Sequence, residues 1–488
     1  MHYIQPKDRY QTSFFTALDD YVSGDNPVRV IDFIVESIVR ENQEAFLYKG
    51  QSNEGRKSYS PNTMLKLYIY GYLNGINSSR KLEKETHRNL EVKWLLGDLQ
   101  PDHKTIANYR KDNKQQLQAF TRKFRYFLKD QGYIEGKEVA IDGTKVKANA
   151  RRRMLSESGI KKQLEKLDEK VMTYLQQLDE NDKKDDLLDE FDSSELTEEN
   201  LRLLEKIFKL EKEKEELIRH QEQQKSTGKK HISPTDQAAN LMKGTDGKYP
   251  GYNIQGAVDG KYNMIADAIV TDHQMDRNLL QPVMESVKDN LDLEPEIGLA
   301  DKGYDNPKMI EELEENSSTV FYIPKEETKR DKEEITFTYD QDNDQVICSQ
   351  GKPLKLIAKN IKKGQQITDV YQGTECDGCP VRDKCTRSKN GRIYSRYHNQ
   401  QWRDSYTNRI NSITGKDYIN RRKAIVEHVF GTIKYWMGKM PLMLRGIDGA
   451  QAEIDIYSVA YNLKRLCNVE QFELIMQQVR VYDWKISR

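Results

Sequence analysis

The stretch from residue 139 to residue 145 reads VAIDGTK. Three apolar residues precede an acid, Asp142, and a glycine follows it, which is typical of a short buried strand that ends in a turn. Residues 297–301 read IGLAD, so a second short apolar run also ends in an acid, Asp301. Two acids at the ends of buried strands predict a sheet edge that carries carboxylates.

A third acid lies in a stretch with helical character. Residues 424–431 read AIVEHVFG, with Glu427 near the centre. On a helix, steps of four and seven place Asn420, Lys423 and Lys434 on the same face as Glu427. The three acids are separated by 159 and 126 positions in the chain. They can meet only in a core that combines a sheet with a helix, which predicts an α/β fold.

Three carboxylates suit one kind of chemistry, the transfer of phosphodiester bonds. Two divalent metal ions ~3.5–4 Å apart activate the attacking oxygen and stabilise the departing one, and they prefer hard oxygen ligands. The simpler interpretation treats each acid as an ordinary turn or surface residue, since the chain has 78 acidic residues. For any single acid that interpretation is favoured. Taken together, with basic residues beside each, the three acids favour a site for divalent metal ions.

Composition sets the broad class. With 488 residues, the chain is too long for one ordinary core, so two to four domains are expected. Its 78 basic and 78 acidic residues cancel, but they are segregated, with residues 156–222 acidic and residues 421–439 basic. No run approaches the ~20 apolar residues that span a bilayer. Residues 1–10 lack an apolar signal core. We therefore expect a cytoplasmic protein with no membrane partner.

The pattern of apolar residues divides the chain into segments. Short helical stretches and tight turns over residues 61–132 fit a helix-turn-helix-like unit or a plain helical bundle equally well. The first 60 residues are expected to be an irregular arm with a short helical start. The expected domains are a helical DNA-binding or dimerisation domain (1–132), three parts of a catalytic core (133–155, 231–334 and 391–488 with its closing helices), a helical hairpin insert (156–230) and a Cys-rich β insert (335–390).

The hairpin insert is predicted from a heptad pattern. Its apolar residues alternate steps of four and three. The first arm carries Ile160, Leu164, Leu167, Val171, Tyr174 and Leu178, and the second carries Leu203, Ile207, Leu210 and Leu217. Asp-rich residues 179–194 are expected to form the turn. The charged residues outside the apolar seam are most simply a solvated face, so a projecting antiparallel coiled coil is predicted.

Four of the five cysteines cluster. Cys376, Cys379 and Cys385 follow one another at short spacing, and Cys348 lies 28 positions before the first of them. So few cysteines in a long chain argue against a disulfide framework. Four thiolates can instead close a tetrahedral Zn²⁺ site that stabilises a unit too small to bury a core. The alternative is a set of reduced free cysteines in a small β unit.

Basic residues lie near the acids and are candidates for contacts with DNA phosphates. For each of them, the alternative is a solvated basic surface. The candidates are Arg151, Arg152 and Arg153 after Asp142, Lys302 after Asp301, and Arg421, Arg422, Lys423 and Lys434 around Glu427.

Taken in order, these motifs resemble the DDE-type transposases of bacterial insertion sequences. The resemblance rests on IDGTK (141–145), ADKGYD (300–305) and VEHVFGTIK (426–434), with two N-terminal stretches, residues 70–82 and PDHKTI (101–106). Each motif is short, but the ordered set covers nearly the whole chain.

The resemblance implies a ribonuclease-H-like mixed sheet with flanking helices and a homodimeric or higher homo-oligomeric enzyme. Such an enzyme binds the terminal inverted repeats of its element, cuts double-stranded DNA and joins the 3′ ends to target DNA. It works with two Mg²⁺ or Mn²⁺ ions held by Asp142, Asp301 and Glu427, in the bacterial cytoplasm at the nucleoid. This chain departs from the Tyr-Arg-Glu-Lys signature of related enzymes, since Asn420 and Lys423 stand where tyrosine and arginine are usual, while Lys434 matches.

Other interpretations stay open at this point. An inactive or domesticated descendant would bind DNA without cutting it, and a metal-dependent nuclease would cut without joining. A coiled-coil scaffold would explain residues 156–226 but leave the acids at the strand ends without a role.

Overall fold

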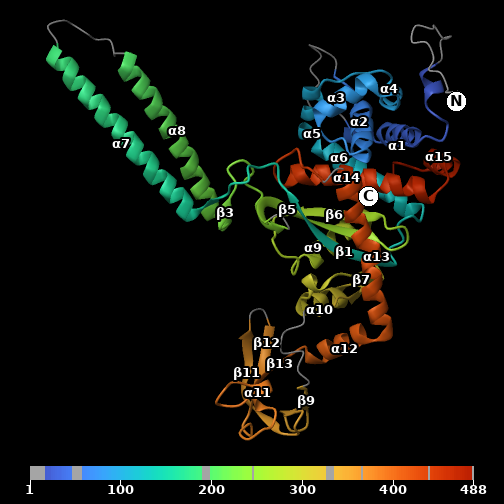
Figure 1. Ribbon diagram of the computed structural model, residues 1–488. Coiled ribbons are helices and arrows are strands. Elements are labelled where there is room, and N and C mark those ends of the chain that lie inside the picture. The colour runs from blue at the N-terminus through green and yellow to red at the C-terminus, as the bar shows by residue number, and fades with distance from the viewer. Residues whose placement is uncertain are drawn as a thin grey trace, which may run out of the picture.

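The computed structural model describes residues 17–46, 58–188, 198–244, 247–325, 335–363, 366–437 and 440–485. Helices form one end of the molecule, a mixed sheet lies in the middle, and a small antiparallel sheet lies at the opposite end (Figure 1). A long helical hairpin projects to one side. Within the described ranges, every helix is too short or too polar to cross a membrane.

The N-terminal region is a body of short helices. Side-chain caps begin several of them, because Asn26, Ser60 and Asp102 each accept a hydrogen bond from a backbone N–H of the first turn. The helices are η1 (Leu18–Tyr21), α1 (Pro27–Glu41), η2 (Gln43–Phe46), α2 (Pro61–Leu73), α3 (Ser79–Arg88), α4 (Leu90–Leu96), α5 (His103–Asp112) and α6 (Lys114–Asp130). The expected irregular arm is therefore wrong over residues 27–41, where α1 buries an apolar stripe.

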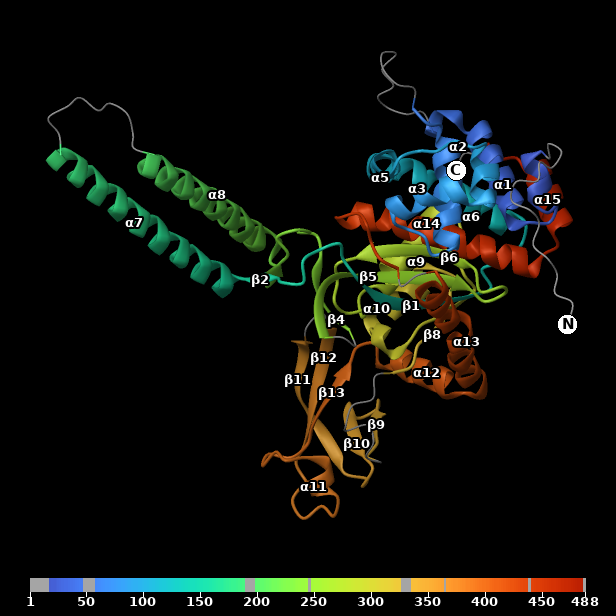
Figure 2. The same cartoon turned by 45° about the horizontal axis from the view of Figure 1, so that its top comes forward.

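The last helices of the chain complete this body. They are α14 (Ile447–Val469) and α15 (Phe472–Val481). Helix α14 contacts α2 and α6 on one side and the sheet on the other. The rings of Tyr72 and Tyr457 lie 4.6 Å apart, and Asn77 Nδ2 donates to Tyr457 Oη at 2.6 Å. The two ends of the chain thus share one core, as Figure 2 shows.

The central sheet mixes parallel and antiparallel strands in the order β4-β5-β1-β7-β8, and β6 pairs with β5. Its strands are β1 (Glu138–Lys147), β4 (Asn240–Gly244), β5 (Gly247–Asp259), β6 (Ile265–Thr271), β7 (Ile297–Leu299) and β8 (Val320–Tyr322). The helical elements beside it are α9 (Leu280–Leu291), η3 (Lys302–Tyr304), α10 (Pro307–Asn316), α12 (Gln400–Asn411) and α13 (Ile413–Trp436). The expected α/β class, a mixed sheet with flanking helices, is confirmed.

The central strand corrects one expectation. Asp142 does not end a short strand, because β1 is ten residues long and continues past Asp142 to Lys147, and the expected glycine turn is absent. β5 pairs with β1 from Val139 to Lys147, whereas β7 pairs only with Glu138, Val139 and Ala140. Asp142 therefore lies just beyond the point where β1 loses its parallel neighbour. Asp301 follows the end of that neighbour.

The inserted hairpin consists of α7 (Glu157–Leu188) and α8 (Glu198–Thr227). Asn181 Nδ2 donates to Asn200 Oδ1 at 3.1 Å, and Lys206 lies over the ring of Tyr174, so the arms run antiparallel. Helix α7 extends to Leu188, through the residues expected to begin the turn. Residues 189–197 lie outside the described part of the chain.

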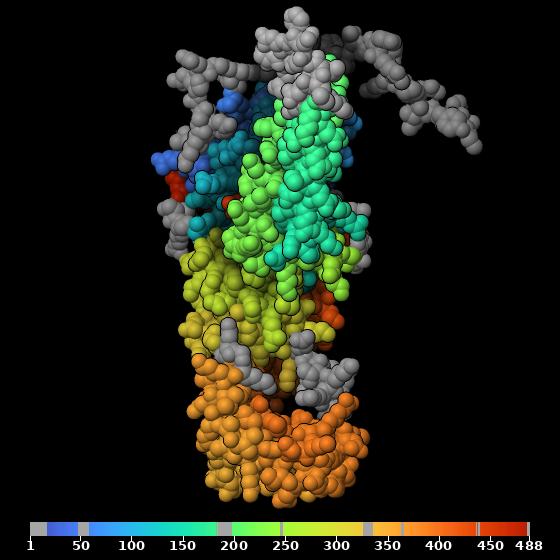
Figure 3. Space-filling view, turned by 90° about the vertical axis from the view of Figure 1, so that its left-hand side faces the viewer, coloured from blue at the N-terminus to red at the C-terminus, as the bar shows by residue number. Residues whose placement is uncertain are grey.

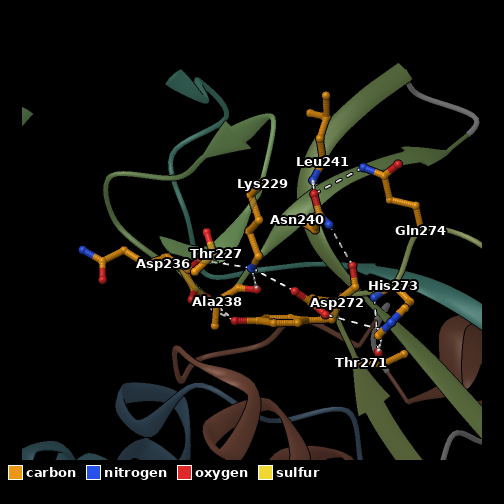
Figure 4. Close-up of polar contacts among 12 residues, drawn as sticks. Thr227, Lys229, Asp236, Ala238, Asn240, Leu241, Thr271, Asp272, His273 and Gln274 are labelled. Atoms are coloured by element: carbon orange, nitrogen blue, oxygen red, sulfur yellow. Dashed lines mark hydrogen bonds and ion pairs between the residues drawn. The ribbon is translucent and has the colours of Figure 1, made fainter. Parts of the chain in front are cut away.

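A polar cluster joins the base of the hairpin to the sheet (Figure 4). The short strands β2 (Leu155–Ser156) and β3 (His231–Ile232) pair there. Lys229 Nζ donates to the carbonyl of Ala238 at 2.8 Å and pairs with Asp272 at 2.9 Å. Asn240 Nδ2 donates to the carbonyl of Asp272 at 3.0 Å. These bonds link the end of α8 to the strand ends of the sheet.

The small β unit is a lobe of its own, at the lower end of Figure 3. Its strands follow the order β13-β12-β11-β10-β9. The elements are β9 (Phe337–Asp340), β10 (Gln345–Cys348), β11 (Pro353–Lys363), β12 (Gln366–Gly373), α11 (Arg382–Cys385) and β13 (Ile393–Tyr397). Val346, Leu354 and Tyr371 are its fully buried hydrophobic residues. So small a core gives little stability by itself.

Candidate active site

Asp142 is the acid nearest the centre of the sheet. Its Oδ1 accepts a hydrogen bond from the N–H of Gly143 at 2.8 Å, and a quarter of its side chain is exposed. Burial raises the pKa of Asp142 to about 6, and the charges of Asp301 and Asp276 raise it further, while the Gly143 N–H and the Arg422 guanidinium lower it. Asp301 and Asp276 therefore lie close enough to Asp142 to interact with it electrostatically.

Asp301 and Glu427 reach the same region from other elements. Asp301 caps η3 and accepts from the N–H of Gly303 at 2.7 Å, directly after β7. Glu427 lies on α13, and 60% of its side chain is exposed. Helix α13 packs on the sheet, where Phe430 lies so close to Gly256 that an added Cβ would be 2.8 Å from its ring. That close approach fixes the helix against β5.

One guanidinium lies between two of the acids. Arg422 Nη1 is 3.7 Å from Asp142 Oδ2, and Arg422 Nη2 is 3.7 Å from Glu427 Oε1. The Arg422 side chain is only 11% exposed, and within the described residues its Nη1 has no hydrogen-bond partner. A buried cation thus balances two carboxylates that would otherwise repel each other.

A second cation approaches Asp142 from α13. Lys434 Nζ donates to the hydroxyl of Thr144, two residues after Asp142 on β1. Burial lowers the pKa of Lys434, and the charge of Asp142 opposes that change. Lys434 and Glu427 lie on one face of α13, as their spacing predicted.

The other basic candidates fall into two groups. Arg421 is exposed and forms an ion pair with Glu138 at 2.8 Å, so its charge is already partly neutralised. Five candidates lie on the surface without an ion pair in the described part of the chain: Arg151, Arg152, Arg153, Lys302 and Lys423. The three arginines follow β1, between the sheet and the base of the hairpin.

Two residues of this region were not anticipated from the sequence. Asp276, in the loop before α9, accepts hydrogen bonds at Oδ1 from Asn253 Nδ2 at 2.7 Å and Gln255 Nε2 at 2.8 Å. Tyr304 is fully buried, and burial raises the pKa of its hydroxyl, with the charges of Asp276, Asp142 and Asp301 adding to the effect. Neither residue has a local sequence signal, although Tyr304 lies within the ADKGYD motif.

The donor set fits divalent metal ions in type. Asp142, Asp301 and Glu427 present hard carboxylate oxygens, and the Arg422 guanidinium shows that a cation fits between two of them. The three side chains do not surround a single metal position. Within the described residues, no three His, Cys, Asp or Glu side chains lie close enough together to hold one metal ion.

The four clustered cysteines line one cavity of about 30 Å³, here called the cysteine hollow: Cys348, Cys376, Cys379 and Cys385. The N–H of Arg392 donates to Cys376 Sγ at 3.4 Å. Burial raises the pKa of the Cys385 thiol, the Arg392 charge lowers it, and the other three cysteines raise it. The Cys385 thiol therefore lies close enough to the other three to interact with them electrostatically, although within the described residues no three of these thiols are close enough to hold one metal ion. Cys467 lies apart from them on α14.

Comparisons with known proteins identify two regions. The family described as "Transposase domain (DUF772)" matches residues 16–112, which hold most of the N-terminal helices. The family described as "Transposase DDE domain" matches residues 347–467, which hold the cysteine hollow and Glu427. Asp142 and Asp301 lie outside both matches. No curated protein matches the chain.

One solved structure aligns with most of the chain. It is the cryo-EM structure of a piggyBac transposase synaptic complex with hairpin DNA, with 10% sequence identity over 93% of this chain and 79% of that chain. Its TM-score of 0.34 is too low to carry an argument. The family matches carry the assignment instead. Transposase families thus match both the N-terminal helices and the segment around α13, and the second match is to a DDE domain, a catalytic domain that cleaves and transfers DNA strands.

Proposed function

We propose that this transposase binds the terminal inverted repeats of its element, cleaves the DNA and joins the 3′ ends to target DNA. Asp142, Asp301 and Glu427 are the metal-binding carboxylates of this reaction. One observation carries the proposal. Acids from three distant parts of the chain converge where β7 ends beside β1, and one buried guanidinium lies between Asp142 and Glu427.

The residues have separable roles in the proposal. Two Mg²⁺ or Mn²⁺ ions, when bound, supply the activated oxygen nucleophile and stabilise the leaving oxygen. Arg422 neutralises the charges of Asp142 and Glu427, the two carboxylates that would hold metal ions. Lys434 would offer its ammonium to a phosphate beside Asp142, because its Nζ already lies at the hydroxyl of Thr144, two residues after Asp142 on β1.

The DNA path follows from the exposed cations. Arg151, Arg152 and Arg153 follow β1, the strand that carries Asp142, and Lys302 and Lys423 lie close to Asp301 and Glu427 in the chain. Contacts from these side chains to phosphates position the duplex without reading its sequence. Two terminal repeats must be brought together before joining, so the active species in this proposal is a homodimer or a larger homo-oligomer.

The cysteine hollow is proposed to hold one structural Zn²⁺. Four thiols around one small cavity are the ligand set of a closed tetrahedral site. A metal would stabilise the β unit, because its three fully buried hydrophobic residues bury too little surface to do so alone.

Strand cleavage and joining on DNA that carries the element ends tests the function. Wild type is compared with Glu427→Gln and with Asp417→Asn, an exposed acid on the same helix, in Mg²⁺ and in Mn²⁺. We expect joined product from wild type and Asp417→Asn and none from Glu427→Gln. Cleavage without joining would identify a nuclease, and binding without cleavage by wild type would identify an inactive DNA-binding descendant.

A further inference from the structure

A buried hydrogen-bond network lies beneath the acidic site. At its centre is Gln255 of β5, which is fully buried. Its Oε1 accepts from the hydroxyl of Tyr304, and its Nε2 donates to Asp276 Oδ1 at 2.8 Å and to Asn253 Oδ1 at 3.1 Å. Asn253 Nδ2 donates to the same Asp276 oxygen at 2.7 Å. Both ends of the Gln255 amide are therefore used, which fixes its orientation.

The network touches the backbone beside two of the acids. Gly143, the residue after Asp142, lies against the network. A Cβ added to Gly143 would lie 2.4 Å from Gln255 Nε2 and 2.8 Å from Asp276 Oδ1. Tyr304 ends η3, the turn that Asp301 caps. Gly143 of β1 pairs with Gln255 of β5, so these two residues face the same side of the sheet. Side chains alternate along a strand, so the side chain of Asp142 points to the opposite side. The network therefore supports the site from behind.

We infer that Gln255 is a positioning residue for the metal site, acting through Tyr304 and Asp276. It ties the turn that carries Asp301 to the strand that carries Asp142. The inference rests on the proposed function, because it assigns a role relative to the proposed metal ligands. Sub-ångström placement of ligands decides whether two metals bind at the productive separation.

The network has features of a support for metal ligands. Partners that orient metal ligands are usually buried and fully hydrogen-bonded, and their loss lowers metal affinity by about 10–100-fold. Gln255 cannot be replaced by an acid without cost, because a carboxylate accepts from Tyr304 but cannot donate to Asp276 and repels its charge. Tyr304→Phe is the milder change, since it removes one hydroxyl and keeps the buried ring.

The experiment measures Mn²⁺ affinity of the full chain by titration calorimetry without DNA. The variants are Gln255→Glu and Tyr304→Phe. The control is Gln451→Glu on α14, because Gln451 Nε2 also donates to an acid, Asp455 Oδ1 at 3.2 Å, in another part of the molecule. Thermal midpoints are recorded for all variants, so that a loss of affinity can be compared with a loss of stability.

We expect Mn²⁺ affinity to fall about tenfold or more in Gln255→Glu and less in Tyr304→Phe, with Gln451→Glu unchanged. Wild-type affinity in Gln255→Glu and Tyr304→Phe, or an equal loss in Gln451→Glu, would overturn the positioning role. Asp142→Asn in the same titration separates the two claims. If it binds Mn²⁺ like wild type, the proposed metal ligands are wrong, whatever the network variants show.

Discussion

The acidic site and the cysteine hollow are both candidate metal centres, but the chain builds them in opposite ways. The four cysteines lie between residues 348 and 385 and line one cavity of the small β unit. The acids come from β1, the end of β7 and α13, and they meet only when the central sheet has formed and α13 has packed on it. A local centre can gain or lose its metal without disturbing the rest, whereas a non-local centre depends on the whole core.

The largest effect is expected from Asp142→Asn. The amide keeps the shape of the side chain but removes the charge that binds a divalent cation, so cleavage should fall by about 10³-fold or more. DNA binding should be nearly unchanged, because the exposed cations remain. Cleavage is measured on labelled element ends, and binding by gel shift. A variant that cuts DNA at the wild-type rate would remove Asp142 from the site.

The next effect concerns the local centre. Cys379→Ser should lose the one Zn²⁺ that each wild-type chain binds. The β unit should then be cut more readily in limited proteolysis, because its hydrophobic core is too small to stabilise it without the metal. Metal content is measured by mass spectrometry of the purified protein. Mn²⁺ affinity at the acids should stay the same. If Cys379→Ser also lowered that affinity, the two centres would not be independent.

A smaller effect is expected from Gly143→Ala. The added methyl would collide with Gln255 and Asp276, so the free energy of unfolding should fall by about 1–3 kcal/mol. Gly24→Ala is the matched control, since its added Cβ has nothing within 4 Å. Denaturant unfolding followed by circular dichroism compares the two. Equal stability of both variants would mean that the network tolerates movement of β1.

The smallest effect concerns pH. Asp455 pairs with Arg125 at 3.6 Å, and burial raises its pKa to about 7, while Arg125 lowers it and Asp267 raises it. Between pH ~4 and ~7 the folded chain keeps a proton that the unfolded chain has released, so this group makes stability fall as the pH rises. Asp455→Asn should flatten that dependence. Thermal midpoints from pH 4 to 8 check it, and an unchanged slope would contradict the assignment.

Local features of this fold were predictable from the sequence. The heptad seam predicted the hairpin, and short helices were expected over residues 61–132, where α2 to α6 lie. The irregular arm expected over the first 60 residues was wrong over residues 27–41, because Pro27 suits the first turn of a helix and here begins α1. In each case the outcome depends on neighbours within a few residues.

Non-local features were not predictable in the same way. The length of β1 beyond Asp142 is set by β5, about 100 positions later. Arg422 was expected to contact DNA phosphates, yet it lies buried between two acids because α13 turns it toward β1. Asp276 does not belong to any of the recognised sequence motifs, and its position beside Gly143 is visible only in the folded structure. Pairings of this kind need the three-dimensional structure.

The central claim is that Asp142, Asp301 and Glu427 share one metal site. Iron-mediated backbone cleavage tests it most directly, because Fe²⁺ bound in place of Mg²⁺ generates hydroxyl radicals that cut the chain near the metal. The full-length protein is treated with Fe²⁺, ascorbate and peroxide, and the fragments are mapped by mass spectrometry. We expect cuts near all three acids, suppressed by excess Mg²⁺. Cuts near only one of them, or none that Mg²⁺ suppresses, would contradict it.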